Sequence, residues 1–205
     1  EYDLKRIELA MIRLGSPQYH IKNIIHVAGT NGKGSTIANL KALLKGQGFS
    51  VNSFTSPHLI SPKERINING SDIADKKLLD LLMYIIENTS GIPLSYFELL
   101  TCAGFIAFNK LKSDFTLMEV GLGGRKDATN IIRAPKACVI TPISLDHQEF
   151  LGSTLSKIAY EKAGIIKYKT PTFIGRQKRS AMKVIKAEAE YFDCPLFVHG
   201  KDWKI

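Results

Sequence analysis

Hydrophobic residues along the chain fall into short apolar runs separated by longer amphipathic stretches. The short runs, each closed by Gly, Pro, Ser or Thr, predict six strands at 24–27, 51–55, 115–120, 137–141, 172–175 and 196–198. Apolar positions at helical spacing predict helices over 37–44, 75–87, 96–110, 154–163 and 178–191. Strands that alternate with helices are typical of an α/β fold, a P-loop-type three-layer sandwich with a mostly parallel sheet. Such a sheet collects its chemistry at the carboxyl ends of its strands.

The first strand leads into a glycine-rich turn. In the segment NIIHVAGTNGKGSTIANLKALLKG, Gly29, Gly32 and Gly34 allow a tight turn whose N–H groups point inward. Anions bind at the N-terminus of the helix that follows, where Lys33 would neutralise phosphate charge and a hydroxyl just after it, Ser35 or Thr36, would reach a magnesium ion. The pattern departs from the usual phosphate loop because a glycine stands between the lysine and the hydroxyl. A glycine turn without a ligand is the alternative.

Polar residues follow the next strands. The segment 56–70 contains Pro57 and Pro62, which predict irregular structure, together with His58, and we interpret it as a loop that covers a ligand. A plain surface connection is the alternative. Glu119 ends a strand, at a position suited to a metal-binding carboxylate, although a strand-end Glu is commonly paired with a nearby Arg or Lys.

Two further side chains are candidates for the same edge of the sheet. His147 follows the strand at 137–141 and is a plausible ligand beside a nucleotide loop and an acid, although a lone His is commonly a surface residue. Glu161 and Lys162 come at the end of a predicted helix, where a cation is favoured by the helix C-terminus alone.

Composition limits the class of protein. The 205 residues are 44% hydrophobic and 23% charged, as in an ordinary globular domain, and the formal net charge is +9. A positive balance suits an anionic ligand or nucleic acid, but the basic residues are mostly dispersed, so nucleic-acid binding is not expected. Cys102, Cys138 and Cys194 lie far apart, and the chain shows no secretory segment, which favours reduced thiols in the cytoplasm. No apolar run reaches the roughly 18 residues of a membrane span.

Six motifs, in order along the chain, identify a family. GTNGKGST, TSPHLISPKERI, SYFELLT, EVGLGGRKDATN, LDHQEFLG and EKAGIIK closely resemble the dihydrofolate synthases and folylpolyglutamate synthases of the Mur ligase superfamily. The resemblance covers essentially the whole chain and implies that residues 1–205 form the N-terminal ATP-binding domain, with the fold of the Mur ligase central domain. Family members continue into a C-terminal domain that supplies the glutamate and part of the nucleotide site. We therefore expect residues 1–205 to bind ATP without ligase activity of their own.

The resemblance also implies a reaction. ATP and Mg²⁺ would convert a carboxylate of dihydropteroate or folate into an acyl phosphate, which the amine of L-glutamate attacks to give an amide. A monomer is expected. Two alternatives stay open: another Mur-type amide ligase that acts on a cell-wall precursor, and a nucleotide-binding module without catalysis.

Site residues follow from the family motifs. The resemblance assigns nucleotide binding to the loop residues Gly29, Thr30, Asn31, Gly32, Lys33, Gly34, Ser35 and Thr36. It assigns one magnesium ion to Ser35 and Glu119, and a second to His147 and Lys162, with Lys162 carbamylated. Lys33, His147 and Lys162 would be catalytic. The substrate-binding residues would be Pro57, His58, Phe97 and Asp127, with the Phe97 ring stacked on the pterin and Asp127 accepting its N–H bonds.

Overall fold

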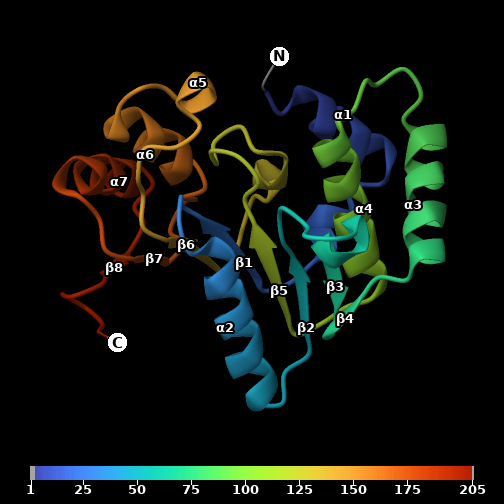
Figure 1. Ribbon diagram of the computed structural model, residues 1–205, viewed down its shortest axis with the longest axis horizontal. Coiled ribbons are helices and arrows are strands. Elements are labelled where there is room, and N and C mark those ends of the chain that lie inside the picture. The colour runs from blue at the N-terminus through green and yellow to red at the C-terminus, as the bar shows by residue number, and fades with distance from the viewer. Residues whose placement is uncertain (1–2, 205) are drawn as a thin grey trace.

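A computed structural model describes residues 3–204 of the protein. An eight-stranded sheet forms its centre (Figure 1). The strand order is β4-β3-β2-β5-β1-β6-β7-β8, and every neighbouring pair is parallel except those that involve β3 and β4. The strands are β1 Ile24–Ala28, β2 Val51–Phe54, β3 Ile66–Ile68, β4 Ser71–Asp72, β5 Phe115–Glu119, β6 Ala137–Ile140, β7 Thr172–Ile174 and β8 Leu196–Val198. The six strands predicted from the apolar runs are confirmed.

Helices connect the parallel strands. They are α1 Lys5–Arg13, α2 Lys33–Gly46, α3 Asp75–Asn88, α4 Tyr96–Lys110, α5 Gln148–Leu151, α6 Leu155–Ala163 and α7 Arg179–Tyr191. Three short 3₁₀ turns accompany them, η1 Pro17–His20, η2 Pro62–Arg65 and η3 Ala128–Ile131. The predicted helices correspond to α2, α3, α4, α6 and α7, whereas α1 and the short α5 were not predicted.

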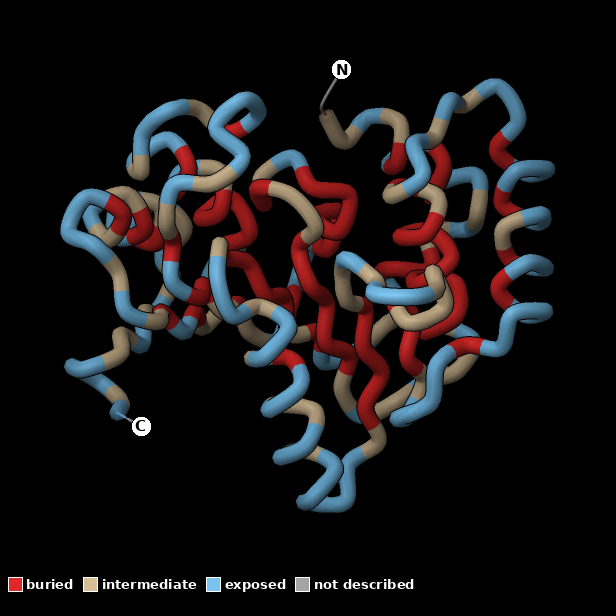
Figure 2. Tube along the Cα trace, viewed as in Figure 1, coloured by how far each residue is buried: buried red, intermediate tan, exposed pale blue. Residues whose placement is uncertain are grey.

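The side chains of β1 show how the layers form. Val27 packs with Ile37 of α2 in one apolar cluster, whereas Ile24 belongs to a cluster with Phe105 of α4 on the opposite face. Ala28 joins a third cluster, built with α6 and α7. Because successive side chains of a strand point to opposite faces, α2 covers one face of the sheet and α4, α6 and α7 cover the other. Figure 2 shows the central strands as the most continuous buried part of the chain. The three-layer α/β fold is confirmed.

The segment 56–70 is more regular than its prolines predicted. Pro62 begins η2, where a missing N–H costs nothing, and Ser61 and Glu64 form a capping box around it. The Glu64 carboxylate also accepts the N–H groups of Leu59 at 2.8 Å and Ile60 at 2.9 Å. The chain then continues into β3, which pairs antiparallel with β2. The expectation of irregular structure throughout 56–70 was therefore wrong.

The three cysteines are free thiols, with Cys102 and Cys138 buried and Cys194 partly exposed. Burial raises the pKa of the Cys102 and Cys138 thiols to about 12, so both stay protonated near neutral pH. Across residues 3–204, no helix has the length and apolar character that crossing a membrane requires.

Candidate functional site

The carboxyl ends of β2, β5, β1 and β6 meet at one edge of the sheet. Strand β1 lies between β5 and β6, with Val27 beside Glu119 and Ala28 beside Ile140. Because these strands are parallel, the loops that follow them lie next to each other. The predicted glycine loop, the strand-end Glu119 and the loop before His147 are thereby brought to one place.

The glycine loop follows β1 and leads directly into α2. Gly29 and Gly32 have φ values of 143° and 86°, which an L side chain rarely adopts, and a Cβ at Gly29 would also overlap Thr141. The backbone N–H groups of Thr30 and Asn31 donate to the Pro142 carbonyl at 3.1 and 3.2 Å, which ties the loop to the segment after β6. The loop is therefore held from outside while the N-terminus of α2 stays open to an anion.

Polar side chains surround the start of α2. Lys33 is the first helical residue, and its Nζ donates to the Thr30 carbonyl at 3.4 Å. The Thr36 hydroxyl donates to the Gly32 carbonyl at 2.7 Å, within the first turn of the helix. Ser35 is exposed. Of the two hydroxyls that the sequence left open, that of Ser35 is thus the better placed to meet a ligand.

Glu119 faces the same helix start from the end of β5. It is 3% exposed, and its Oε2 accepts the Ser56 N–H at 3.3 Å. A Cβ at Gly34 would lie 3.8 Å from that oxygen, so the carboxylate is close to the glycine loop. Burial raises the pKa of Glu119, while the Ser56 N–H and the charge of Lys33 oppose the rise. Glu119 takes part in none of the ion pairs among residues 3–204, so the simple Arg or Lys partner of the alternative interpretation is not found.

Lys162 reaches the glycine loop from α6. It is 3% exposed, and its Nζ donates to the Gly29 carbonyl at 3.0 Å. Burial lowers the pKa of Lys162 to about 8, and the positive charge of Lys33 adds to this effect. The burial of Lys162 and its hydrogen bond to Gly29 go beyond the alternative interpretation, in which the lysine is a surface cation favoured by the helix C-terminus alone. None of the ion pairs among residues 3–204 joins Glu161 to Lys162, so the alternative of a plain pair between the two is not found.

His147 lies farther out, just before α5. Its φ is 46°, its side chain is 50% exposed, and its Nε2 is 3.6 Å from Oδ2 of Asp146. Within residues 3–204 no three or more His, Cys, Asp or Glu side chains gather into a metal-binding group. A divalent ion at this edge would therefore need phosphate or water among its ligands, which is the usual situation for Mg²⁺.

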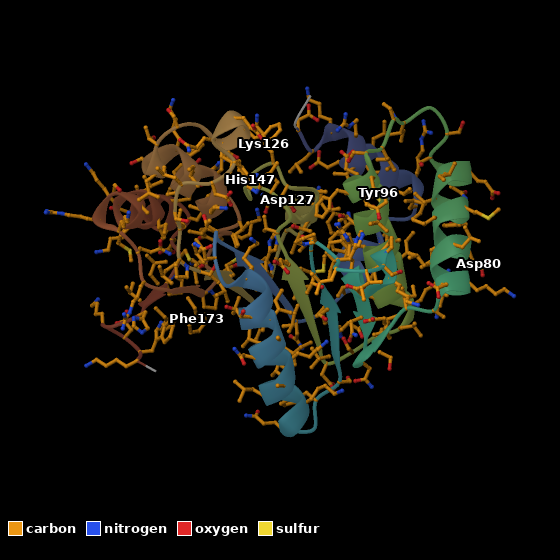
Figure 3. The ribbon with its side chains drawn as sticks, in the orientation of Figure 1. Asp80, Tyr96, Lys126, Asp127, His147 and Phe173 are labelled. Carbon is orange, nitrogen blue, oxygen red and sulfur yellow. The ribbon has the colours of Figure 1, made fainter. Side chains whose placement is uncertain are left out.

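A cavity of about 560 Å³ is lined by Ser56, whose N–H donates to Glu119 beside the glycine loop. Pro57, Phe97, Asp127 and His147 all line it, so four residues predicted from the sequence meet there. Figure 3 shows Asp127 and His147 above the carboxyl ends of the central strands, with Tyr96 at the start of α4. The Phe97 ring packs edge-on against Phe54, with centroids 6.0 Å apart. The cavity thus combines an aromatic wall with polar groups, as small-molecule sites commonly do.

The basic residues in the wall were not among the predicted substrate-binding residues. Arg6, Arg65 and Lys126 line the cavity, and the Arg65 guanidinium lies 5.8 Å from the centre of the Tyr96 ring. His58 contacts the cavity indirectly, since its Nδ1 accepts the Arg65 Nε–H at 2.9 Å. Arg65 stands in the motif TSPHLISPKERI, so the motif contained the signal, whereas Arg6 comes from α1, which carries none of the six motifs.

Asp127 organises the loop that forms the cavity floor. It is 1% exposed, and its Oδ1 accepts the Thr129 N–H at 3.0 Å while its Oδ2 accepts the Leu122 N–H at 2.8 Å. Burial raises the pKa of Asp127, and the hydrogen bonds from Thr129 and the backbone oppose the rise. The carboxylate is therefore fixed by its own loop as well as bordering the cavity.

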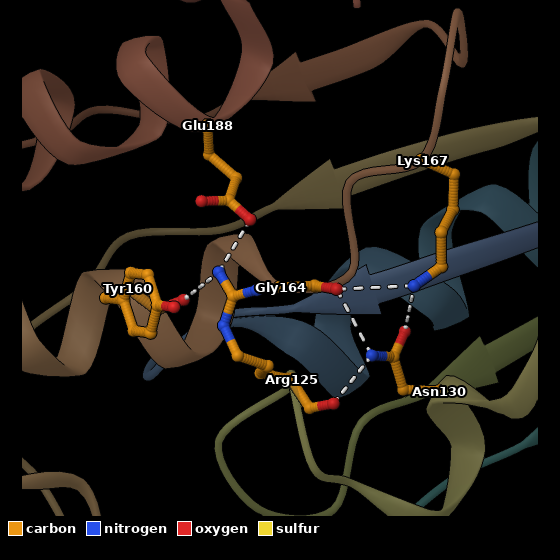
Figure 4. Close-up of polar contacts among 6 residues, drawn as sticks. All are labelled: Arg125, Asn130, Tyr160, Gly164, Lys167 and Glu188. Atoms are coloured by element: carbon orange, nitrogen blue, oxygen red, sulfur yellow. Dashed lines mark hydrogen bonds and ion pairs between the residues drawn. The ribbon is translucent and has the colours of Figure 1, made fainter. Parts of the chain in front are cut away.

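The same loop is anchored to α6 and α7 (Figure 4). Arg125 Nη2 donates to Glu188 Oε1 of α7 at 2.6 Å. Asn130 Nδ2 donates to the carbonyls of Arg125 at 2.8 Å and of Gly164 at 3.1 Å, and Lys167 Nζ donates to Asn130 Oδ1 at 2.8 Å. These contacts hold the floor of the cavity against α6, the helix that carries the buried Lys162.

An open helix N-terminus behind a glycine loop, a buried strand-end carboxylate and a buried lysine define a nucleotide-type site on an α/β domain. Residues 27–202 match the Mur ligase middle domain, and the chain belongs to this family. Its sequence is similar to dihydrofolate synthase/folylpolyglutamate synthase of Bacillus subtilis, 41% identical over 199 residues, which is 94% of this chain and 46% of that protein. It is also similar to the mitochondrial folylpolyglutamate synthase of Homo sapiens, 39% identical over 204 residues, which is 95% of this chain and 35% of that protein.

Solved structures agree with this assignment. Folylpolyglutamate synthase of Mycobacterium tuberculosis, complexed with ADP, superposes with a TM-score of 0.93 at 38% identity, covering 100% of this chain and 48% of that one. E. coli FolC in complex with DHPP and ADP gives a TM-score of 0.93 at 33% identity, covering 100% of this chain and 48% of that one. The chain therefore spans between 35% and 48% of the length of these four proteins. The fold and family predicted from the six motifs are confirmed.

Proposed function

We propose that this protein binds ATP at the glycine loop and dihydropteroate or folate in the adjoining cavity, and that it serves ATP-dependent ligation of L-glutamate to that acid. The observation that carries the proposal is the continuity of the two sites. Glu119 borders the phosphate loop through Gly34 and contacts Ser56, which together with Pro57 lines the cavity. An ADP complex and a DHPP complex among the similar structures support the same two classes of ligand.

The chemistry requires positive charge at the boundary between the sites. A carboxylate is a poor electrophile and repels phosphate, so its conversion to an acyl phosphate needs cations that stabilise the transferred group. Lys33 is the first residue of α2, and the Nζ of Lys162 donates to the Gly29 carbonyl in the loop before that helix. The amine of L-glutamate would then attack the acyl phosphate, forming the amide bond and releasing phosphate.

Mg²⁺ fits the donors at this boundary. The ion would neutralise phosphate charge when bound. The Ser35 hydroxyl and the Glu119 carboxylate would hold one ion beside the phosphates, since both border the start of α2. His147 and a carbamylated Lys162 would hold a second. A carbamate forms on a neutral amine, and the low pKa of Lys162, about 8, supplies that form near neutral pH.

The cavity supplies the substrate end. Phe97 would stack on the pterin ring, and Asp127 would accept its N–H groups from the cavity floor. Pro57 lines the same space, and His58 would act through its contact with Arg65. The Arg65 guanidinium also offers a partner for the negative charges of a folate-like acid.

Direct binding measurements test the proposal. Calorimetry should show ATP binding, and a fluorescence titration should show binding of dihydropteroate but not of a nucleotide-linked muramyl precursor. Lys33→Ala should remove measurable ATP binding because the phosphate charge loses its partner, whereas Lys45→Ala, an exposed lysine in the last turn of the same helix, should bind ATP normally. Unchanged ATP affinity in Lys33→Ala would remove the glycine loop from the mechanism. Preference for the muramyl precursor would indicate a cell-wall ligase instead.

A further inference from the structure

A buried hydrogen-bonded chain runs from the central strand to the cavity floor. His26 of β1 is 0% exposed, and its Nε2 lies 2.9 Å from Oγ1 of Thr129. The Thr129 hydroxyl in turn lies 2.5 Å from Oδ1 of Asp127, which borders the cavity. His26 is thus connected to the proposed substrate site through Thr129 and Asp127, although His26 itself does not line the cavity.

The direction of the hydrogen bonds between His26, Thr129 and Asp127 follows from which of these groups can donate a proton. Oδ1 of Asp127 also accepts the Thr129 N–H, and Oδ2 accepts the Leu122 N–H, an arrangement that suits an ionised carboxylate. The single hydroxyl proton of Thr129 is then donated to Asp127. The hydroxyl oxygen can only accept from His26, so the proton of the imidazole must lie on Nε2.

The other ring nitrogen agrees with this direction. Nδ1 of His26 is buried and has no hydrogen-bond partner within residues 3–204. A protonated and positively charged ring would leave an N–H of a cation buried and unpaired there, which costs much more than an unpaired lone pair. The neighbouring charge of Lys167 further disfavours the cation. The neutral Nε2–H tautomer is the form that satisfies all three residues.

We propose that His26, as the neutral Nε2–H tautomer, is a positioning residue that orients the Thr129 hydroxyl and thereby holds Asp127 as an ionised acceptor for the pterin end of the substrate. This inference rests on the proposed function, because it concerns the same cavity. His26 occupies the strand that also leads into the glycine loop at Gly29. One rigid strand would therefore place both the phosphate site and the pterin acceptor.

Thr129 and Asn130 together show that the cavity floor is held from two sides. Both belong to η3. The Asn130 side chain accepts a hydrogen bond from the Lys167 ammonium and donates one to the Gly164 carbonyl. That outer contact fixes the backbone of the loop, whereas the inner contact from His26 fixes a side-chain hydroxyl. Only the inner contact bears on the charge and rotamer of Asp127.

Paired substitutions separate a hydrogen-bonding role from packing. His26→Gln keeps an N–H donor near the Nε2 position, and His26→Leu removes it. Thr129→Ser keeps the hydroxyl, and Thr129→Val removes it at nearly constant shape. We expect His26→Leu and Thr129→Val to weaken dihydropteroate binding by about tenfold, the effect of one lost buried hydrogen bond, while ATP affinity changes by less than about twofold. His26→Gln and Thr129→Ser should recover most of the affinity.

The double variant tests whether His26 acts through Thr129. If it does, His26→Leu should weaken binding no further in the Thr129→Val protein, because the contact is already lost. Additive losses, or equal losses in the Gln and Leu variants, would overturn the positioning role. If circular dichroism shows that His26→Leu does not fold, the dihydropteroate affinities of Thr129→Val and Thr129→Ser test the same hydrogen bond.

A spectroscopic measurement tests the tautomer independently of any ligand. In the ¹⁵N-histidine-labelled protein, His26 should give the nitrogen shifts of a neutral Nε2–H ring from about pH 5 to about pH 8. An Nδ1–H tautomer or an imidazolium would overturn the inference. If the unmodified protein binds ATP but no dihydropteroate, the proposed substrate class is wrong. The tautomer measurement then still tests whether His26 orients Thr129 and Asp127, without reference to a substrate.

Discussion

Acidification should destabilise this protein through His26. Burial lowers the pKa of His26 from 6.5 to about 3, and the charge of Lys167 acts in the same direction. In the unfolded chain the imidazole takes up a proton as the pH falls below 6.5, whereas the folded protein keeps it neutral. The unfolded state therefore binds more protons between these two values, and stability rises with pH across that window.

The size of the effect follows from the two pKa values. With 6.5 for the unfolded chain and about 3 for the folded protein, lowering the pH from about 7 to about 5 removes about 2 kcal/mol of unfolding free energy through this one residue. The change continues at about 1.4 kcal/mol per pH unit down to the folded pKa. Carboxylates that titrate in the same range contribute equally in the parent protein and in a variant that differs only at His26.

Urea unfolding of the parent protein and of His26→Gln at the two pH values measures this contribution. The parent protein should lose about 2 kcal/mol more than the variant on acidification, whatever the absolute stability of each. Thr129→Ser is the matched control, since it alters the other end of the same hydrogen bond but retains the imidazole, and it should keep the additional loss. Equal pH dependence in the parent protein and His26→Gln would refute the reasoning, because it would mean that His26 titrates alike in both states.

Three further outcomes are expected. Asp127→Ala should weaken dihydropteroate binding by about 1–3 kcal/mol, measured by fluorescence titration, and equal affinity would contradict its place in the substrate site. Lys162 should give a carbamate resonance with ¹³C-bicarbonate and Mg²⁺, growing as the pH rises through about 8 because the neutral amine reacts, and a spectrum unchanged by Lys162→Met would exclude it. Gly29→Ala should lower the unfolding free energy by about 1–3 kcal/mol, since its φ and the contact with Thr141 both oppose a side chain, whereas the exposed Gly46→Ala in α2 should not destabilise in urea.

Local signals explain what the sequence could predict. The parallel strands and the glycine loop are encoded by apolar runs and by the backbone freedom of Gly29 and Gly32, which act over a few residues. Helix α1 was missed although its buried residues Ile7, Ala10 and Met11 stand at the i, i+3, i+4 spacing of a helix face, so the signal was present in the sequence. This face packs against α4 and η3.

The polar part of the site shows the same division. Glu119 and Lys162 were identified through motifs, but their burial and their contacts with the loop at 29–34 come from the fold. His26 could not be recognised from the sequence, because a histidine in an apolar strand gives no sign of its partner. Thr129 is 103 residues away, and only the pairing of β1 with β5 and β6 brings the two together.

The two ends of the sheet have a consequence for self-association. β4 is only two residues long and both are exposed, and β8 is three residues long and is followed by an isolated bridge between His199 and Trp203. A foreign strand needs a long, flat row of free N–H and carbonyl groups to add to a sheet. Neither end offers such a row, and the buried strands β1, β2 and β5 lie inside the sheet, where their backbone groups are already paired. We therefore expect the folded domain to resist association by strand addition.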